Sequence, residues 1–179
     1  MKKSAKCELI TVSVSAILTI VLGLLLHFLY EICDKNSFVA LFSPINESVW
    51  EHLKLIFTPF VFTMSVEYFI YGKNKARFFF SKLVGVTAGL LTTLTLFYTY
   101  TGIWGMTFEV INIIIYVISI ICAYGIALIL MNTLKKRCDI LESLSIFALA
   151  LICVAFFIFT FYPPEIPLFR DPTDMSYGI

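Results

Sequence analysis

The side chains that could do chemistry are concentrated in one short stretch of a chain that is otherwise largely apolar. This stretch, residues 43–59, reads SPINESVWEHLKLIFTP. Its carboxylates and imidazole are groups that bind metal ions and that act as acids and bases. The stretch therefore predicts a polar site for a cation or a small ligand. The candidate ligand-binding residues are Asn46, Glu47, Ser48, Trp50, Glu51, His52 and Lys54.

Helical spacing predicts how these groups are arranged. At about 100° per residue, Glu47, Glu51 and Lys54 share one narrow stripe. Carboxylates four residues apart repel each other, and a bound cation would relieve that repulsion. His27 is expected at the same depth, near the end of the preceding apolar segment. We therefore predict a divalent cation held by Glu47, Glu51, His52 and His27, although their spacing matches no established ligand motif.

A structural role explains the same residues without a ligand. Asn46 and Glu47 would stabilise a helix N-terminus in any case. Trp50 suits the membrane interface as an anchor, and His27 suits a hydrogen bond between helices. The stretch is therefore either a functional polar site or an interfacial network of caps and packed side chains.

Composition places the chain in a membrane. Of its 179 residues, 60% are hydrophobic and 14% are charged, whereas soluble domains carry about 25% charged residues. One domain is expected at this length. The net charge of +1, without a basic patch, predicts no nucleic-acid partner. The five cysteines form no C-x-x-C pair, so neither a structural zinc site nor a disulfide framework is expected.

Apolar segments predict an all-α polytopic membrane protein with five transmembrane helices. The expected spans are residues 9–30, 50–71, 82–101, 109–134 and 142–162. The connection 31–49 would lie in the interface or dip into the membrane as a re-entrant segment. Ser43 and Pro44 are typical of a helix start, and Pro59 is expected to kink the second span.

Charge predicts the orientation of these spans. One side collects most of the 13 basic residues, whereas only Lys35, Lys54 and Arg170 fall on the other. Positive loops stay in the cytoplasm, so the N-terminus is expected inside and the C-terminus outside the cell membrane. The residues expected inside are Lys2, Lys3, Lys6, Lys73, Lys75, Arg77, Lys82, Lys135, Lys136 and Arg137.

Two further features concern helix contacts. Gly85 and Gly89 lie one turn apart and suit close approach of another helix, which predicts a homo- or hetero-oligomer through this face. Glu67 lies near the cytoplasmic end of its span and is expected to snorkel or to pair with Lys73.

The stretch SPINESVWEHLK, residues 43–54, resembles the signature of a bacterial family of small multi-pass membrane proteins described only as a domain of unknown function. The ending, residues 164–172 and 177–179, is similar to the ending of that family, so the resemblance covers the whole chain. It implies a bacterial inner-membrane location and no particular activity.

Three functions remain open. The first is a membrane protein that binds or transports a cation or a small amine-bearing ligand at an external site. The second is a membrane enzyme in which a metal activates water, or in which Glu51 and His52 act as acid and base. The third is a structural or accessory subunit.

The tail, residues 163–179, is expected to emerge beside the polar stretch. Pro164, Pro167 and Pro172 stiffen it, which lowers the entropy cost of ordering it. We predict that the tail folds back over the polar stretch as a lid, with Arg170 near Glu47 or Glu51. The alternative is a disordered terminus.

Overall fold

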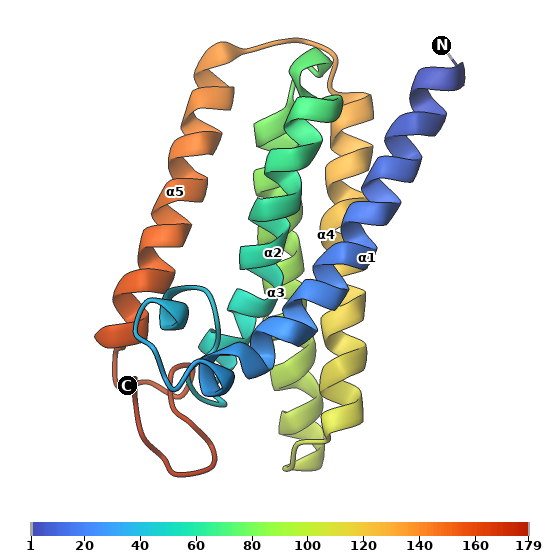
Figure 1. The fold of residues 1–179 in the computed structure, drawn as a ribbon. Helices are drawn as coiled ribbons and strands as arrows, with labels where there is room; N and C mark the ends of the chain where they lie inside the picture. Colours follow the sequence, from blue (N-terminus) through green and yellow to red (C-terminus); the bar gives the residue numbers. More distant parts are fainter. Residues whose placement is uncertain (1, 179) are drawn as a thin grey trace.

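The computed structural model describes residues 2–178 and folds them into a bundle of five long helices (Figure 1). This confirms the all-α prediction. The helices are α1 (Lys2–Ile32), α2 (Val49–Ile70), α3 (Phe78–Trp104), α4 (Glu109–Thr133) and α5 (Asp139–Phe161), and two short 3-10 turns are η1 (Val39–Leu41) and η2 (Gly72–Asn74).

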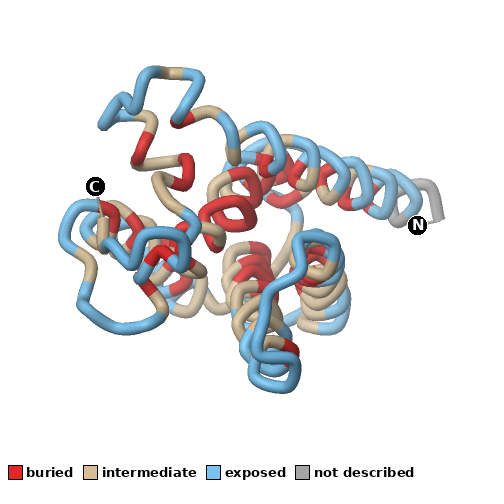
Figure 2. The backbone as a smooth tube through the Cα atoms, turned by 90° about the horizontal axis from the view of Figure 1, so that it is seen from below, coloured by how far each residue is buried: buried red, intermediate tan, exposed pale blue. Residues whose placement is uncertain are grey.

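Each long helix is compatible with a membrane span. All five are long and apolar enough to cross a membrane. The shortest, α2, has 22 residues, and at about 1.5 Å per residue it is about as long as the hydrocarbon core is thick. Figure 2 shows buried residues on the helix faces that turn toward one another and a largely exposed outer surface, as lipid-facing helices require.

The two ends of the bundle differ in charge. We call one the basic end: it holds the N-terminus and the connections 71–77 and 134–138 (Figure 1). We call the other the motif end: it holds residues 33–48, 105–108 and 162–178. The termini therefore lie at opposite ends, and the basic residues collect at one of them, as the sequence predicts. Which end faces the cytoplasm stays a prediction.

The start of α2 differs from the prediction. Ser43 and Pro44 do not begin the helix. Instead, Ser48 is the N-cap, and its hydroxyl accepts a hydrogen bond from the backbone N–H of Glu51. The Asn46 side chain in turn accepts from the N–H of Ser48 at 3.1 Å. Residues 43–47 are therefore a loop in which Glu47 lies outside the helix.

Helices α3 and α4 pack closely through the two glycines. A side-chain carbon at Gly85 would lie 2.4 Å from the backbone oxygen of Ala123, and one at Gly89 would lie 2.8 Å from that of Ser119. Small residues allow such close backbone approach in membranes. Both glycines are thus buried inside the chain against α4, so any oligomer contact has to use another surface.

Helix α2 carries two buried ion pairs. Glu51 pairs with Lys54 near the motif end, and Glu67 pairs with Lys82 of α3 nearer the basic end. All four side chains are nearly inaccessible to solvent. The expected pairing of Glu67 with Lys73 is wrong. Helix α3 begins at Phe78, so Lys82 lies inside the helix, and its ammonium group points inward to Glu67.

Candidate functional site

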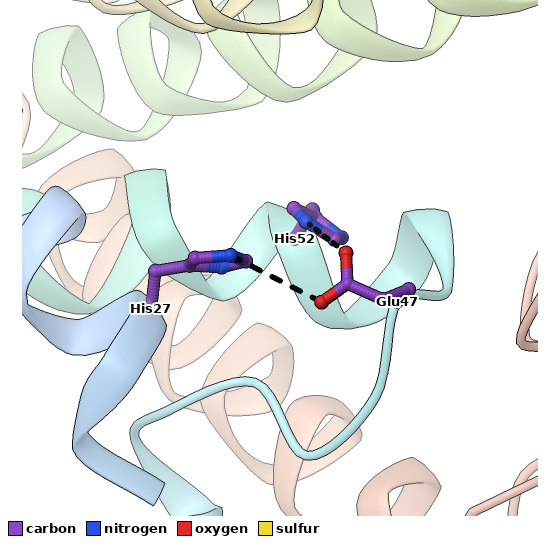
Figure 3. A group of neighbouring side chains, drawn as sticks. All are labelled: His27, Glu47 and His52. Atoms are coloured by element: carbon purple, nitrogen blue, oxygen red, sulfur yellow. Dashed lines mark ion pairs between the residues drawn. The ribbon is translucent and has the colours of Figure 1, made fainter. Parts of the chain in front are cut away.

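Three side chains from two helices and a loop meet at the motif end (Figure 3). His27 comes from α1, His52 from the first turn of α2, and Glu47 from the loop before α2. The Glu47 carboxylate lies between the rings, with Oε2 3.4 Å from His52 Nε2 and Oε1 4.0 Å from His27 Nε2. One ligand atom from each residue lies within 4.8 Å of the others. We call these three residues the HEH cluster.

The hydrogen bond of His52 orients its ring for binding. Its Nδ1 lies 2.9 Å from the backbone oxygen of Ser48, which only accepts, so Nδ1 carries the proton. In the neutral ring this leaves Nε2 unprotonated and directed at Glu47. A backbone carbonyl that fixes the tautomer in this way is a usual companion of a metal-binding histidine.

The cluster is open to solvent on one side. About half of the Glu47 side chain is exposed, at 51%, against 33% for His52 and 29% for His27. The two imidazole rings lie 5.3 Å apart between centroids. His27 Nδ1 is buried and has no hydrogen-bond partner among the described residues. The arrangement offers two imidazoles and a carboxylate together with an open approach for a fourth ligand.

Glu51 does not belong to this cluster, although it was predicted as a metal ligand. Its side chain is turned toward Lys54 and the loop before α2, where one carboxylate oxygen accepts from the backbone N–H of Ile45 at 3.0 Å and from Lys54 Nζ at 2.6 Å. Glu47 and Glu51 do not form the predicted stripe, because α2 begins only after Glu47.

The buried Lys54 side chain links three elements of the fold. Its ammonium group donates to the backbone oxygen of Ala40 at 2.9 Å, to Glu51 and to Thr160 Oγ1 at 2.6 Å. One fully buried side chain thereby joins η1, α2 and α5. This use of all its donors leaves Lys54 unavailable to an external ligand.

The remaining predicted residues surround the cluster without entering it. Ser48 caps α2, and Asn46 donates to the backbone oxygen of Gly178 at 3.3 Å. Trp50 packs between aromatic rings of α5 and the tail, with ring centroids 4.7 Å from Phe156 and 4.8 Å from Phe169. These three residues hold the motif end together.

The tail folds back over the polar stretch, as predicted, but through a different residue. The backbone N–H of Trp50 donates to the oxygen of Leu168 at 3.0 Å, and the N–H of Glu47 donates to Asp171 Oδ2 at the same distance. Arg170 is exposed and forms a β-bridge with Tyr177. The predicted pairing of Arg170 with Glu47 or Glu51 is therefore wrong: Asp171 makes the contact.

Asp171 links the tail to the cluster electrostatically. Burial raises its pKa, but this is outweighed by hydrogen bonds from the Thr173 side chain and from the backbone of Glu47 and Thr173, together with the nearby His52, so that the pKa is lowered. The charged form is thus the one that the folded protein stabilises.

The tail contact should therefore weaken in acid. Because the folded-state pKa of Asp171 is lowered, its stabilising effect is complete above the ordinary aspartate value of about 3.9 and is lost as pH falls through the folded value. Asp171→Asn should lower the free energy of unfolding by about 1.5–3 kcal/mol at neutral pH, as for a hydrogen bond to a charged group. Denaturant unfolding between pH 7 and 3 checks this.

Asp174→Asn is the matched control, since Asp174 is exposed in the same tail. It should leave the stability at pH 7 and its acid dependence nearly unchanged. An Asp171→Asn protein with the acid dependence of the unmodified chain would contradict the contact.

Sequence reasoning missed several residues that the structure makes important. The sequence did not single out Asp171, and Thr160 and Tyr124 lie within two of the predicted apolar spans. Tyr124 is buried and its hydroxyl lies 2.7 Å from Thr19 Oγ1. A tyrosine in the middle of an apolar segment was the available signal, because its hydroxyl needs a partner when buried.

Comparison with known proteins adds a family and no activity. A family model described as a family of unknown function matches residues 1–179, which confirms the expected membership in such a family over the whole chain. No curated protein and no solved structure matches the chain.

Proposed function

We propose that this chain, which belongs to DUF6512, a family of unknown function, binds a divalent transition-metal ion through the HEH cluster. The proposed site lies at the outer face of a cell membrane. The observation that carries the proposal is the approach of His27, Glu47 and His52 to within 4.8 Å of one another. His27 comes from another helix, and Glu47 lies in the loop before α2, so helical spacing does not explain why the three residues meet.

The donor set favours a borderline ion over a hard one. Two imidazole nitrogens and one carboxylate suit Zn²⁺, whereas Ca²⁺ and Mg²⁺ prefer oxygen ligands throughout. Three protein ligands with an open position are also the pattern of zinc sites that exchange a water or a ligand. The half-exposed Glu47 leaves such a position on the solvent side.

The proposed location can be tested by labelling cysteines. In intact spheroplasts, a membrane-impermeant thiol reagent should modify Cys33 at the motif end. Cys7 and Cys138, at the basic end, should react only after lysis. The physical reason is that the basic end is retained in the cytoplasm. The reverse pattern would place the HEH cluster inside the cell and refute the external site.

Metal binding is tested directly on the purified protein. Zn²⁺ should raise the thermal stability of the unmodified chain, since a ligand present at about 100 times its Kd adds about 2.7 kcal/mol to the folded state. His52→Ala should reduce Zn²⁺ affinity, measured by calorimetry, by more than about 10–100-fold, which is the usual cost of losing an outer-shell partner.

Glu165→Gln is the matched control, since it removes an exposed carboxylate at the same end but outside the cluster. It should leave Zn²⁺ affinity unchanged, and Mg²⁺ should stabilise no variant. A chain that neither Zn²⁺ nor another transition ion stabilises would remove the proposal and favour an accessory or structural role.

A further inference from the structure

The three residues of the HEH cluster are not held in place by the same kind of structure. His27 and His52 lie in α1 and α2, whose backbones are fixed by helical hydrogen bonds, whereas Glu47 lies in the loop before α2. A carboxylate on a free loop has many positions open to it, and a metal ion would have to order that loop at a cost in entropy. The contacts that fix the backbone of Glu47 therefore decide how well the cluster is prepared for an ion.

The tail supplies the contact at Glu47 itself. The backbone N–H of Glu47 donates to Asp171 Oδ2 at 3.0 Å, and Asp171 is only 5% exposed. One residue earlier in the loop, the Asn46 side chain donates to the backbone oxygen of Gly178, which also belongs to the tail. Asp171 thus holds the loop residue that carries one of the proposed metal ligands.

Asp171 is itself fixed within a turn of residues 171–176. Its Oδ1 accepts from the backbone N–H of Thr173 at 2.7 Å and from the hydroxyl of the same residue. Its backbone N–H donates to the oxygen of Ser176, and its backbone oxygen accepts from the N–H of Met175, both at 3.0 Å. The turn therefore presents Oδ2 to Glu47 from a fixed position.

An apolar anchor holds this turn against α2. Phe169, two residues before Asp171, is buried, and its ring lies 4.8 Å from that of Trp50 between centroids. The backbone N–H of Trp50 donates to the oxygen of Leu168 at 3.0 Å. Trp50 lies in the first turn of α2, as does His52. The tail is therefore fastened to the same helical turn that carries one of the two imidazoles.

We propose that Asp171 is a positioning residue of the HEH cluster, through which the docked tail holds Glu47 between the two imidazoles and raises the affinity for a metal ion. This inference rests on the proposed metal site. The coupling is reciprocal, because an ion that binds more tightly when the tail is docked must favour the docked tail by the same free energy. Displacement of the tail would therefore weaken the binding of the ion.

The first test compares Zn²⁺ affinities by calorimetry. Asp171→Ala removes the acceptor of the Glu47 N–H and should weaken Zn²⁺ binding by about 10–100-fold, the usual cost of losing an outer-shell partner. Glu165→Ala is the matched control, because it removes one negative charge from an exposed residue of the same tail. It should leave the affinity unchanged. Equal affinities of the unmodified and Asp171→Ala proteins would overturn the inference.

A double-mutant cycle measures whether Asp171 acts through Glu47. In a Glu47→Gln background, Asp171→Ala should change Zn²⁺ affinity by less than about twofold, the usual margin for independent changes. The reason is that the carboxylate which Asp171 positions is no longer present. An Asp171→Ala loss of the same size in both backgrounds would show that Asp171 acts on the fold as a whole, and it would refute the positioning role.

The reciprocal effect is measured on the unmodified chain, so it does not depend on whether a variant folds. Zn²⁺ should slow tryptic cleavage of the tail at Arg170, which is exposed, whereas Mg²⁺ should not. In the Glu47→Gln protein, Zn²⁺ should give no such protection. A chain that binds Zn²⁺ but is cleaved at an unchanged rate would refute the coupling and leave the metal site standing. A chain that binds no transition-metal ion would refute both.

Discussion

Lys54→Met should lower the free energy of unfolding by about 3–5 kcal/mol, the usual cost of leaving one member of a buried ion pair without its partner. The ammonium group of Lys54 is fully buried, and it contacts Glu51, Thr160 and the backbone oxygen of Ala40. Without it, the Glu51 carboxylate stays buried, and among residues 2–178 it keeps only the N–H of Ile45 as a donor. Unfolding in mixed micelles by a denaturing detergent measures the change.

Two controls separate the missing charge from the missing packing. Glu51→Gln added to Lys54→Met removes the unpaired carboxylate and should recover much of the lost stability. Lys35→Met removes the lysine of an exposed ion pair with Glu31, in which both side chains are about two-thirds exposed. Its cost should stay below about 1 kcal/mol. An equal loss of unfolding free energy for Lys35→Met and Lys54→Met would mean that the buried network stabilises the fold no more than an exposed ion pair does.

Phe169→Ala should destabilise the protein by about 3–5 kcal/mol, the range for removing a buried phenylalanine side chain. Phe169 is only 5% exposed, and its ring lies 4.8 Å from Trp50 and 5.3 Å from Phe159 between centroids. Phe169 is therefore the buried apolar residue through which the tail packs against α5 and the start of α2. Its loss should also free the tail, which limited proteolysis after residue 163 would detect.

Ile166→Ala is the control for this prediction. Ile166 lies in the same tail but is 48% exposed, so its truncation should cost much less. A Phe169→Ala protein as stable and as resistant to protease as the Ile166→Ala protein would show that the tail is not an anchored part of the fold.

The sequence by itself determined the class of the protein and the region of interest. Five apolar segments, each long enough to span a bilayer, predict the five helices because a chain in lipid has to satisfy its backbone hydrogen bonds within helices. The tail was also predictable: Phe169 is apolar and lies among prolines, so leaving it free would gain nothing. These properties are local, and a sequence displays them directly.

Helical spacing predicted the wrong arrangement of Glu47 and Glu51, because it depended on where α2 begins. Glu47 and Glu51 share a stripe only if the helix includes both, but Ser48 caps it, because its hydroxyl takes the orphan N–H of Glu51. That boundary sends Glu47 toward His27 and His52 and Glu51 toward Lys54. Two similar carboxylates thus receive different surroundings.

Only the tertiary structure decided which distant residues meet. His27 with His52, Glu67 with Lys82, and Tyr124 with Thr19 all join different helices. Their pairing depends on how each helix is rotated and how deeply it is set in the bundle, which side-chain packing determines. Within lipid, burying a polar group is costly unless it finds a partner on another helix. The sequence shows that such groups need partners, but the packed helices decide which partners they obtain.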